Sequence, residues 1–196
     1  MFIVFNKEKI NSYLISLGTV IILFVMAFMI TGNESIETAA STKELPIYNV
    51  DTAEKQVAFT MNCAWNADDI DSILDTLSKY RTHITFFMVG DFANKYPEAV
   101  KKIHEAGHEI GNHSDTHPHV NSLSLEKNIE QIQNCSNKIE QITGKKTTLY
   151  RGPYGEYNDI VIRAAKLQNH ETIQWNLDTL DYTRINRKRN VGKIGK

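Results

Sequence analysis

HITFFMVGDFANKYPEAVKKIHEAGHEIGNHSDTHPH, residues 83–119, is the stretch that decides the predicted fold. Its first residues form an apolar run of the length expected for a buried strand. A helix is predicted over residues 96–107, because a proline stands near its start and Gly107 stands where a C-cap belongs. The short strand HEIGN, residues 108–112, follows. This stretch therefore predicts one strand, helix and strand unit.

The same alternation continues on both sides of this unit. Before it, the apolar run QVAFTM, residues 56–61, indicates another strand. After it, a long helix with isoleucines at helical spacing ends at Gly144, and Cys135 on its apolar face is expected in the packed core. Further strands are expected at 147–151 and 170–177, and helices at Asp68–Tyr80, Leu125–Thr143 and Asn158–Leu167. Such alternation predicts an α/β fold with a parallel sheet, open or closed into a barrel.

Composition sets limits on the rest. A chain of 196 residues has room for one ordinary domain and a short extension. Its 22 basic and 23 acidic side chains give a formal net charge of -1, so no nucleic-acid partner is expected. Cys63 and Cys135 lie far apart in different contexts, which does not indicate a disulfide framework.

The N-terminal segment differs from the remainder. Residues 13–30 are uncharged and apolar, long enough to predict a single membrane-spanning helix. Lys7 and Lys9 precede it, so residues 1–12 are expected in the cytoplasm and the domain outside the cell membrane. The alternative is a cleaved signal peptide, which would make the protein secreted. Residues 31–54 are polar and are interpreted as a linker.

Polar clusters follow the predicted strands, and chemistry in parallel sheets gathers at the carboxyl ends of strands. His113 and His117 are four residues apart in the cluster HSDTHPH. This spacing places both imidazoles on one side of a turn, as a Zn²⁺ site requires. Solvated surface histidines also cluster by chance, so spacing alone leaves both interpretations open. His108 and His119 are interpreted as ordinary histidines.

GHEIGNHSDTHPH, residues 107–119, together with RGPYGEYND, residues 151–159, resembles the polysaccharide deacetylases, the NodB-type domain of carbohydrate esterase family 4. The resemblance runs from Val57 to Tyr182, within a domain placed at residues 55–183. It implies a distorted (β/α) barrel. It also implies metal-dependent hydrolysis of N-acetyl groups from an amino-sugar polymer, peptidoglycan or a chitin-like glycan, at the cell envelope.

The resemblance implies roles for particular residues. His113 and His117 would bind a divalent metal, Zn²⁺ being expected and Co²⁺ the alternative, which polarises the acetamide carbonyl and activates water. Arg151 would orient the catalytic base, and the backbone N–H at Tyr154 would help to stabilise the oxyanion. Pro153 belongs to Arg-x-Pro-Tyr, Asp178 matches the aspartate that tunes a late histidine, and Tyr182 stands where a tryptophan is usual. The resemblance implies that Pro153, Tyr154 and Tyr182 contact the substrate.

The first strand departs from the family. The family reads Thr-Phe-Asp-Asp there, or Thr-Phe-Asp-x-x-Trp in one subgroup, whereas this chain reads TMNCAW, residues 60–65. Trp65 fits the subgroup. Asn62 occupies the position of the base, and an amide cannot accept a proton near neutral pH. Cys63 stands where a metal-binding aspartate is often found, so it is either a thiolate ligand or a packed thiol. Asp68 and Asp69 either replace the missing carboxylates or simply begin a helix.

The C-terminal end of the chain also departs from the family's pattern. After DTLDYT the family continues with a helix and a strand that end in Leu-x-x-His, whose histidine donates a proton to the leaving amine. Here residues 184–196 form a basic tail. It is either a binding element for anionic polymer or the disordered end of a truncated or frame-shifted barrel. Two hypotheses follow: a metal-dependent deacetylase, or a catalytically impaired relative that binds cell-wall glycan without turnover.

Overall fold

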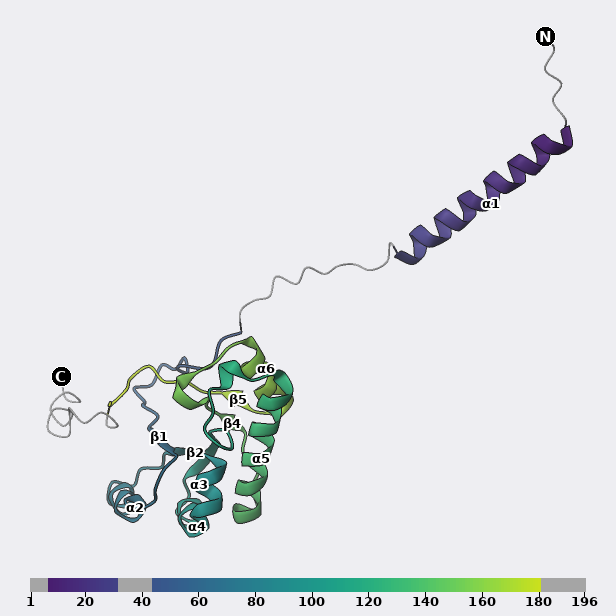
Figure 1. Cartoon of the computed structure of the whole chain (residues 1–196). Coiled ribbons are helices and arrows are strands. Elements are labelled where there is room, and N and C mark those ends of the chain that lie inside the picture. Colours follow the sequence, from purple (N-terminus) through teal and green to yellow (C-terminus); the bar gives the residue numbers. More distant parts are fainter. Residues whose placement is uncertain (1–6, 32–43, 181–196) are drawn as a thin grey trace. The chain divides into compact units, whose positions relative to one another are not determined.

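The computed structural model describes residues 7–31 and 44–180 (Figure 1). The chain divides into two compact units, residues 1–42 and residues 43–196, and each is described by itself. The first unit contains the helix α1, Lys7–Thr31, which includes the predicted membrane segment at residues 13–30. In the part of the chain that the structure describes, no helix has the length and apolar character needed to cross a membrane.

The second unit contains a five-stranded parallel sheet. Its strands lie side by side in chain order: β1 Thr60–Cys63, β2 Thr85–Met88, β3 Glu109–Asn112, β4 Leu149–Tyr150 and β5 Glu171–Thr172. Sequential order is that of a singly wound barrel, whereas a doubly wound sheet reverses direction at a switch point. Beyond β5, Ile47 forms one further parallel bridge with Ile173. The α/β class and the parallel sheet are confirmed, and closure into a barrel stays a prediction.

Helices connect the strands (Figure 1). Their bounds are α2 Ile70–Lys79, α3 Gly90–Lys95, α4 Pro97–Glu105, α5 Leu125–Thr143 and α6 Asp159–Leu167, with short 3₁₀ turns at Val120–Ser122 and Pro153–Gly155. Helix α5 packs against α3, α4 and α6 and is thus the central helix of this layer. Of the α-helices described between residues 44 and 180, the sequence predicted all except α3, which is too short to show a helical period.

Apolar side chains form two buried clusters around this helix. The larger cluster joins β1, β2 and helices α2 to α5, and the smaller one joins α5, α6 and β4. Cys135 belongs to the larger cluster, as predicted. In β2 Phe86, Phe87 and Met88 are all buried, as expected for a parallel strand covered on both faces. Phe87 pairs with Gly111 of β3, where a Cβ would lie 2.5 Å from the Phe87 ring, so only glycine fits there.

Candidate active site

The polar residues of the candidate site lie at the carboxyl ends of three strands. Asn62 lies in β1, His113 directly follows β3 and Arg151 directly follows β4. Backbone hydrogen bonds between the strands continue at His113 and Arg151. The His113 amide donates to the Met88 carbonyl at 2.9 Å, and the Arg151 amide donates to the Asn112 carbonyl at 2.9 Å. Because the strands are parallel, their carboxyl ends meet at one edge, as the sequence predicted.

The two histidines of HSDTH lie together there. The ring centroids of His113 and His117 are 5.2 Å apart. His113 is 2% exposed, and its Nδ1 lies 2.6 Å from the Arg151 carbonyl oxygen. A carbonyl only accepts, so Nδ1 carries the hydrogen and Nε2 keeps its lone pair. Burial lowers the pKa of His113 to about 3 and also lowers the pKa of His117, so both rings are neutral at neutral pH.

These features fit part of a divalent metal site. Metal ligation requires neutral imidazole, and Zn–N bonds are about 2.1 Å long. Two rings at this separation suit a shared ion, and the buried Nδ1 of His117 has no hydrogen-bond partner within the described residues. Among those same residues, however, no group of three or more histidine, cysteine or acidic side chains is placed to hold a metal. The described residues thus present two imidazole donors without a third ligand.

Cys63 does not join the histidines. It alternates with Asn62 along β1, so the two side chains leave opposite faces of the strand. Its side chain is buried in the larger apolar cluster, and burial raises the pKa of the thiol to about 12. A metal ligand must be the thiolate, which this environment disfavours. Of the two interpretations left open for Cys63, a thiolate ligand and a packed thiol, this environment favours the packed thiol.

Arg151 reaches across the site to β1. Its Nη1 donates to Thr60 Oγ1 at 2.9 Å and to Asn62 Oδ1 at 3.0 Å. Its Nε and Nη2 donate to backbone carbonyls after β5, at 3.4 and 3.3 Å. The guanidinium lies 4.0 Å over the Phe87 ring, and the residue is only 3% exposed. Burial lowers the pKa of Arg151 to about 10, so it remains a cation at neutral pH.

Exposed aromatic rings surround His117. The ring centroid of Trp65 lies 5.4 Å from that of His117, and the ring centroid of Tyr154 lies 4.6 Å from it. Trp65 and Tyr154 are 73% and 58% exposed. Tyr154 has a backbone φ of 59°, a left-handed conformation inside the turn that follows Arg151. Its neighbour Pro153 is buried, which indicates that it shapes this turn from within.

One pair in this region escaped the sequence interpretation. His119, taken as an ordinary histidine, stacks on Tyr154 with centroids 4.3 Å apart and planes 14° from parallel. Its Nδ1 lies 2.7 Å from Glu156 Oε1, and the Glu156 carboxylate also accepts from the Asn121 amide at 3.2 Å. The hydrogen bond with His119 is the main cause that lowers the pKa of Glu156. His119 and Glu156 thus connect the loop that carries His113 and His117 with the Arg-x-Pro-Tyr turn. The only sign of this contact in the sequence is the glutamate next to that turn.

Other predicted residues lie elsewhere. Asp178 is exposed, and its carboxylate accepts a hydrogen bond from the Leu180 amide at 2.8 Å. Asp68 and Asp69 are exposed directly before α2, which supports their interpretation as helix-start acids. Tyr182 and the basic tail at residues 184–196 lie outside the described residues. The roles predicted for Asp178 and Tyr182 stay predictions.

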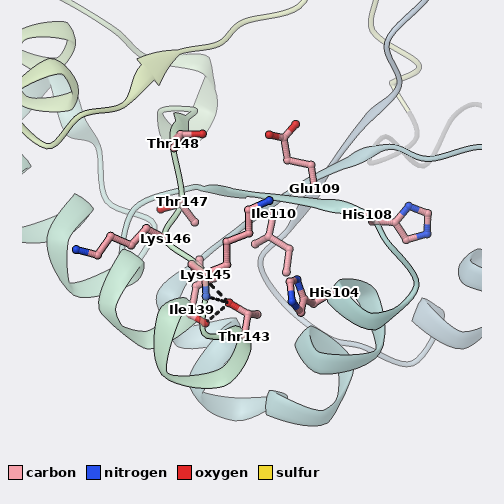
Figure 2. Close-up of a pocket in the computed structure, with 10 residues that line it drawn as sticks. All are labelled: His104, His108, Glu109, Ile110, Ile139, Thr143, Lys145, Lys146, Thr147 and Thr148. Carbon is pink, nitrogen blue, oxygen red and sulfur yellow. Dashed lines mark hydrogen bonds between the residues drawn. The ribbon is translucent and has the colours of Figure 1, made fainter.

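A pocket opens at the opposite ends of the strands (Figure 2). It is lined by His104 and His108, by Glu109 at the start of β3, and by residues 145–148 that lead into β4. These are the amino ends of the strands, whereas the histidine pair lies at the carboxyl ends. The pocket contains none of the predicted site residues.

The structure is thus a parallel α/β domain whose strand ends carry a histidine pair, a buried arginine and exposed aromatic rings. The family model described as polysaccharide deacetylase matches residues 49–173, well over half of the chain. The chain belongs to the polysaccharide deacetylase family.

Individual relatives agree with this assignment. The peptidoglycan-N-acetylmuramic acid deacetylase PdaC of Bacillus subtilis is 35% identical over 145 residues, 74% of this chain and 30% of that protein. A CE4 family pseudoenzyme from Bacillus anthracis has a similar structure, with a TM-score of 0.68 and 34% identity over 70% of this chain and 49% of that one. A mutant of this pseudoenzyme, described as having restored enzymatic activity, matches with the same TM-score. The chain spans less than half of the curated relatives that it matches first, 43% of YlxY and 30% of PdaC from B. subtilis.

Proposed function

We propose that this protein binds N-acetylated glycan of the peptidoglycan type through a deacetylase site that lacks its general base. The observation that carries the proposal is the hydrogen bond between Arg151 Nη1 and Asn62 Oδ1 at 3.0 Å. Arginine only donates, so it fixes the amide with its oxygen toward the guanidinium. The NH₂ end of Asn62 is then left for a ligand. It is a donor, suited to a carbonyl or a water molecule, and it cannot abstract a proton.

The surrounding residues suit a sugar ligand. Trp65 and Tyr154 present exposed rings next to His117, and such rings provide amphipathic contact area for the apolar faces of sugars. Peptidoglycan is the substrate named for PdaC and for a relative from Bacillus cereus, a peptidoglycan-N-acetylglucosamine deacetylase that is 32% identical over 127 residues. This substrate would place the domain at the cell envelope, outside the membrane.

His113 and His117 would hold a divalent ion, Zn²⁺ or Co²⁺, in this site. When bound, such an ion polarises a carbonyl and lowers the pKa of water. The Nδ1–H of His113 donates to the Arg151 carbonyl and thereby orients the ring, with Nε2 free for the ion. Tyr154 would place its backbone N–H near the acetamide oxygen, as in the family. The step that the described residues do not provide is removal of a proton from the attacking water, for which the family uses a carboxylate at position 62.

The test compares acetate release from peptidoglycan and from chitooligosaccharides, with added Zn²⁺ or Co²⁺, by the unmodified protein and by Asn62→Asp. We expect glycan binding by both proteins and acetate release at least about a hundredfold faster from the variant, because a positioned general base contributes 10²- to 10⁴-fold. Asn66→Asp is the matched control, since it adds a carboxylate to the exposed segment after β1. Turnover by the unmodified protein at enzymatic rates would overturn the proposal in favour of an active deacetylase.

A further inference from the structure

The loop that carries both histidines has an unfavourable backbone conformation. Ser114 and His117 have φ angles of 67° and 59°, in the left-handed region that residues other than glycine rarely adopt. Such a conformation persists only where surrounding contacts determine it. The distance between the two imidazoles therefore depends on the contacts that fix the backbone of residues 114–116.

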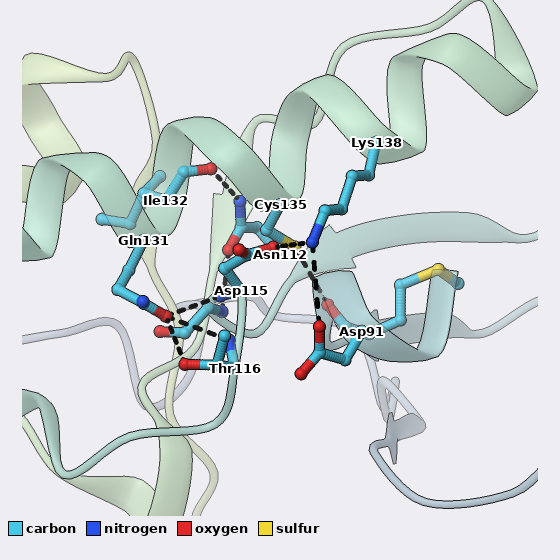
Figure 3. Close-up of polar contacts among 10 residues, drawn as sticks. Asp91, Asn112, Asp115, Thr116, Gln131, Ile132, Cys135 and Lys138 are labelled. Atoms are coloured by element: carbon cyan, nitrogen blue, oxygen red, sulfur yellow. Dashed lines mark hydrogen bonds and ion pairs between the residues drawn. The ribbon is translucent and has the colours of Figure 1, made fainter. Parts of the chain in front are cut away.

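Helix α5 holds the middle of this loop (Figure 3). Gln131 Oε1 accepts hydrogen bonds from the backbone amides of Asp115 and Thr116, each at 3.0 Å, and from the Thr116 hydroxyl at 3.3 Å. Two turns further along the helix, Lys138 Nζ lies 2.7 Å from Asp115 Oδ1 and 3.8 Å from Asp91 Oδ1. Gln131 and Lys138 are seven residues apart, so they project from one side of α5.

The first residues of the loop are also tied to α5. Asn112 Oδ1 accepts from the Ser114 amide at 2.9 Å, and Asn112 Nδ2 donates to the Ile132 carbonyl at 2.7 Å and to Ser136 Oγ at 2.9 Å. On the side of α3 the fit is tight, because a Cβ on Gly90 would lie 2.0 Å from Asp115 Oδ1. The loop therefore lies between the start of α3 and a polar face of α5.

We propose that Gln131 is a positioning residue for the His113–His117 pair. Its side-chain oxygen fixes the two amides that lie between the histidines, so that both imidazoles are held ready for one divalent cation. Neither core cluster includes Gln131, and its side chain is half-buried, so its effect is local to the loop. The inference rests on the proposed function only in taking these two histidines as cation ligands.

The experiment titrates Zn²⁺ alone into the full chain by calorimetry. Gln131→Met keeps the length of the side chain but removes the acceptor, and it should weaken Zn²⁺ binding at least about tenfold, as losses of supporting groups around metal ligands do. Gln131→Glu retains oxygen acceptors for both amides and should regain most of the affinity. Gln133→Met is the matched control, an exposed glutamine of the same helix, and should bind Zn²⁺ like the unmodified protein.

A second measurement separates positioning from a general loss of structure. In metal-free Gln131→Met the Asp115 and Thr116 amides should exchange hydrogen faster, while the thermal midpoint changes little. Unchanged Zn²⁺ affinity together with faster exchange of these amides would overturn the inference, as would an equal loss in Gln133→Met or no Zn²⁺ binding by the unmodified protein. Acetate release by Asn62→Asp is scored separately. Turnover by the unmodified protein overturns the proposed function, and absence of acetate release by Asn62→Asp contradicts the role assigned there to position 62, but either result leaves the role of Gln131 standing.

Discussion

Arg151 is a buried cation whose hydrogen bonds all go to neutral oxygens: a hydroxyl, an amide and two backbone carbonyls. Among the described residues no carboxylate forms an ion pair with it. Burying an unpaired charge is costly, and the rings of Phe87 and Trp175 near the guanidinium offset only part of that cost. At position 62 an aspartate would supply the missing charge, whereas asparagine supplies only the hydrogen bond.

We therefore expect Asn62→Asp to stabilise the fold as well as to restore the base. Charge-assisted hydrogen bonds exceed neutral ones, but Asn62 is exposed, so the expected gain is about 1 kcal/mol in the free energy of unfolding at pH 7. Arg151 would hold the pKa of the new carboxyl below that in the unfolded chain. The gain is then complete above about pH 4 and is lost as the pH falls further.

Urea unfolding of the metal-free protein at several pH values measures this effect. Asn66→Asp again serves as the control, since Asn66 contacts Asp68 and not Arg151. An Asn62→Asp variant that is less stable than the unmodified protein at pH 7 would show that Arg151 is satisfied by neutral partners.

At the scale of elements, His170 joins the start of β5 to its neighbours. Its Nε2 lies 2.8 Å from Thr147 Oγ1 before β4 and 3.2 Å from Ser136 Oγ of α5, and its Nδ1 lies 2.7 Å from the Gln168 carbonyl. The carbonyl requires a hydrogen on Nδ1, so the neutral ring accepts at Nε2. Burial is the main cause that lowers the pKa of His170. Protonation would remove the acceptor that Nε2 presents to these two hydroxyls, which also hydrogen-bond to each other at 2.7 Å.

This arrangement predicts that acid destabilises the packing of α5 on β4 and β5. The unfolded chain protonates His170 near pH 6.5, while the folded protein resists protonation to lower pH. The unfolded state thus binds more protons in that window, so stability is complete above about pH 6.5 and falls as the pH decreases below it. His170→Gln should show a smaller loss of unfolding free energy between pH 7.5 and 5.5. An unchanged pH dependence in the variant would mean that other groups, such as His108, account for the loss.

The sequence predicted elements best where both ends carry a local signal. The helix Leu125–Thr143 was predicted with its observed bounds from the spacing of its isoleucines and from Gly144, which ends it at a φ of 70°. The structure adds that the Ser124 side chain caps its start. The strand expected over residues 170–177 is only Glu171–Thr172, because pairing with a short β4 and not the apolar run sets its length. Pairing partners are not visible in a local pattern.

The candidate site shows the same division. The histidine pair and Arg151 could be predicted because each stands in a short motif at a strand end. The contacts of Gln131 with Asp115 and of His119 with Glu156 join residues 16 and 37 positions apart, and no periodicity marks them. For Cys63 the motif left a thiolate ligand and a packed thiol open, and the alternation of side chains along β1 favours the packed thiol.

For the whole molecule, a metal site made of two loop histidines should connect ion binding to global stability. The folded domain fixes the separation of His113 and His117, so an ion that binds the pair in the folded state and not in the unfolded chain stabilises the fold. At a free Zn²⁺ concentration about 100-fold above Kd, the expected gain is about 2.7 kcal/mol in the free energy of unfolding. Thermal unfolding with Zn²⁺, and again after a chelator removes it, measures this gain.

His117→Ala identifies whether the pair is responsible for that stabilisation. His117 is the better ligand to remove, because its Nδ1 has no hydrogen-bond partner among the described residues, whereas His113 is deeply buried and bonded to the Arg151 carbonyl. The variant should therefore fold but lose most of the Zn²⁺-dependent gain. His104→Ala, which removes a half-buried histidine from α4, should keep it. Equal stabilisation of both variants by Zn²⁺ would mean that the ion binds elsewhere, and the assignment of the pair as a metal site would be wrong.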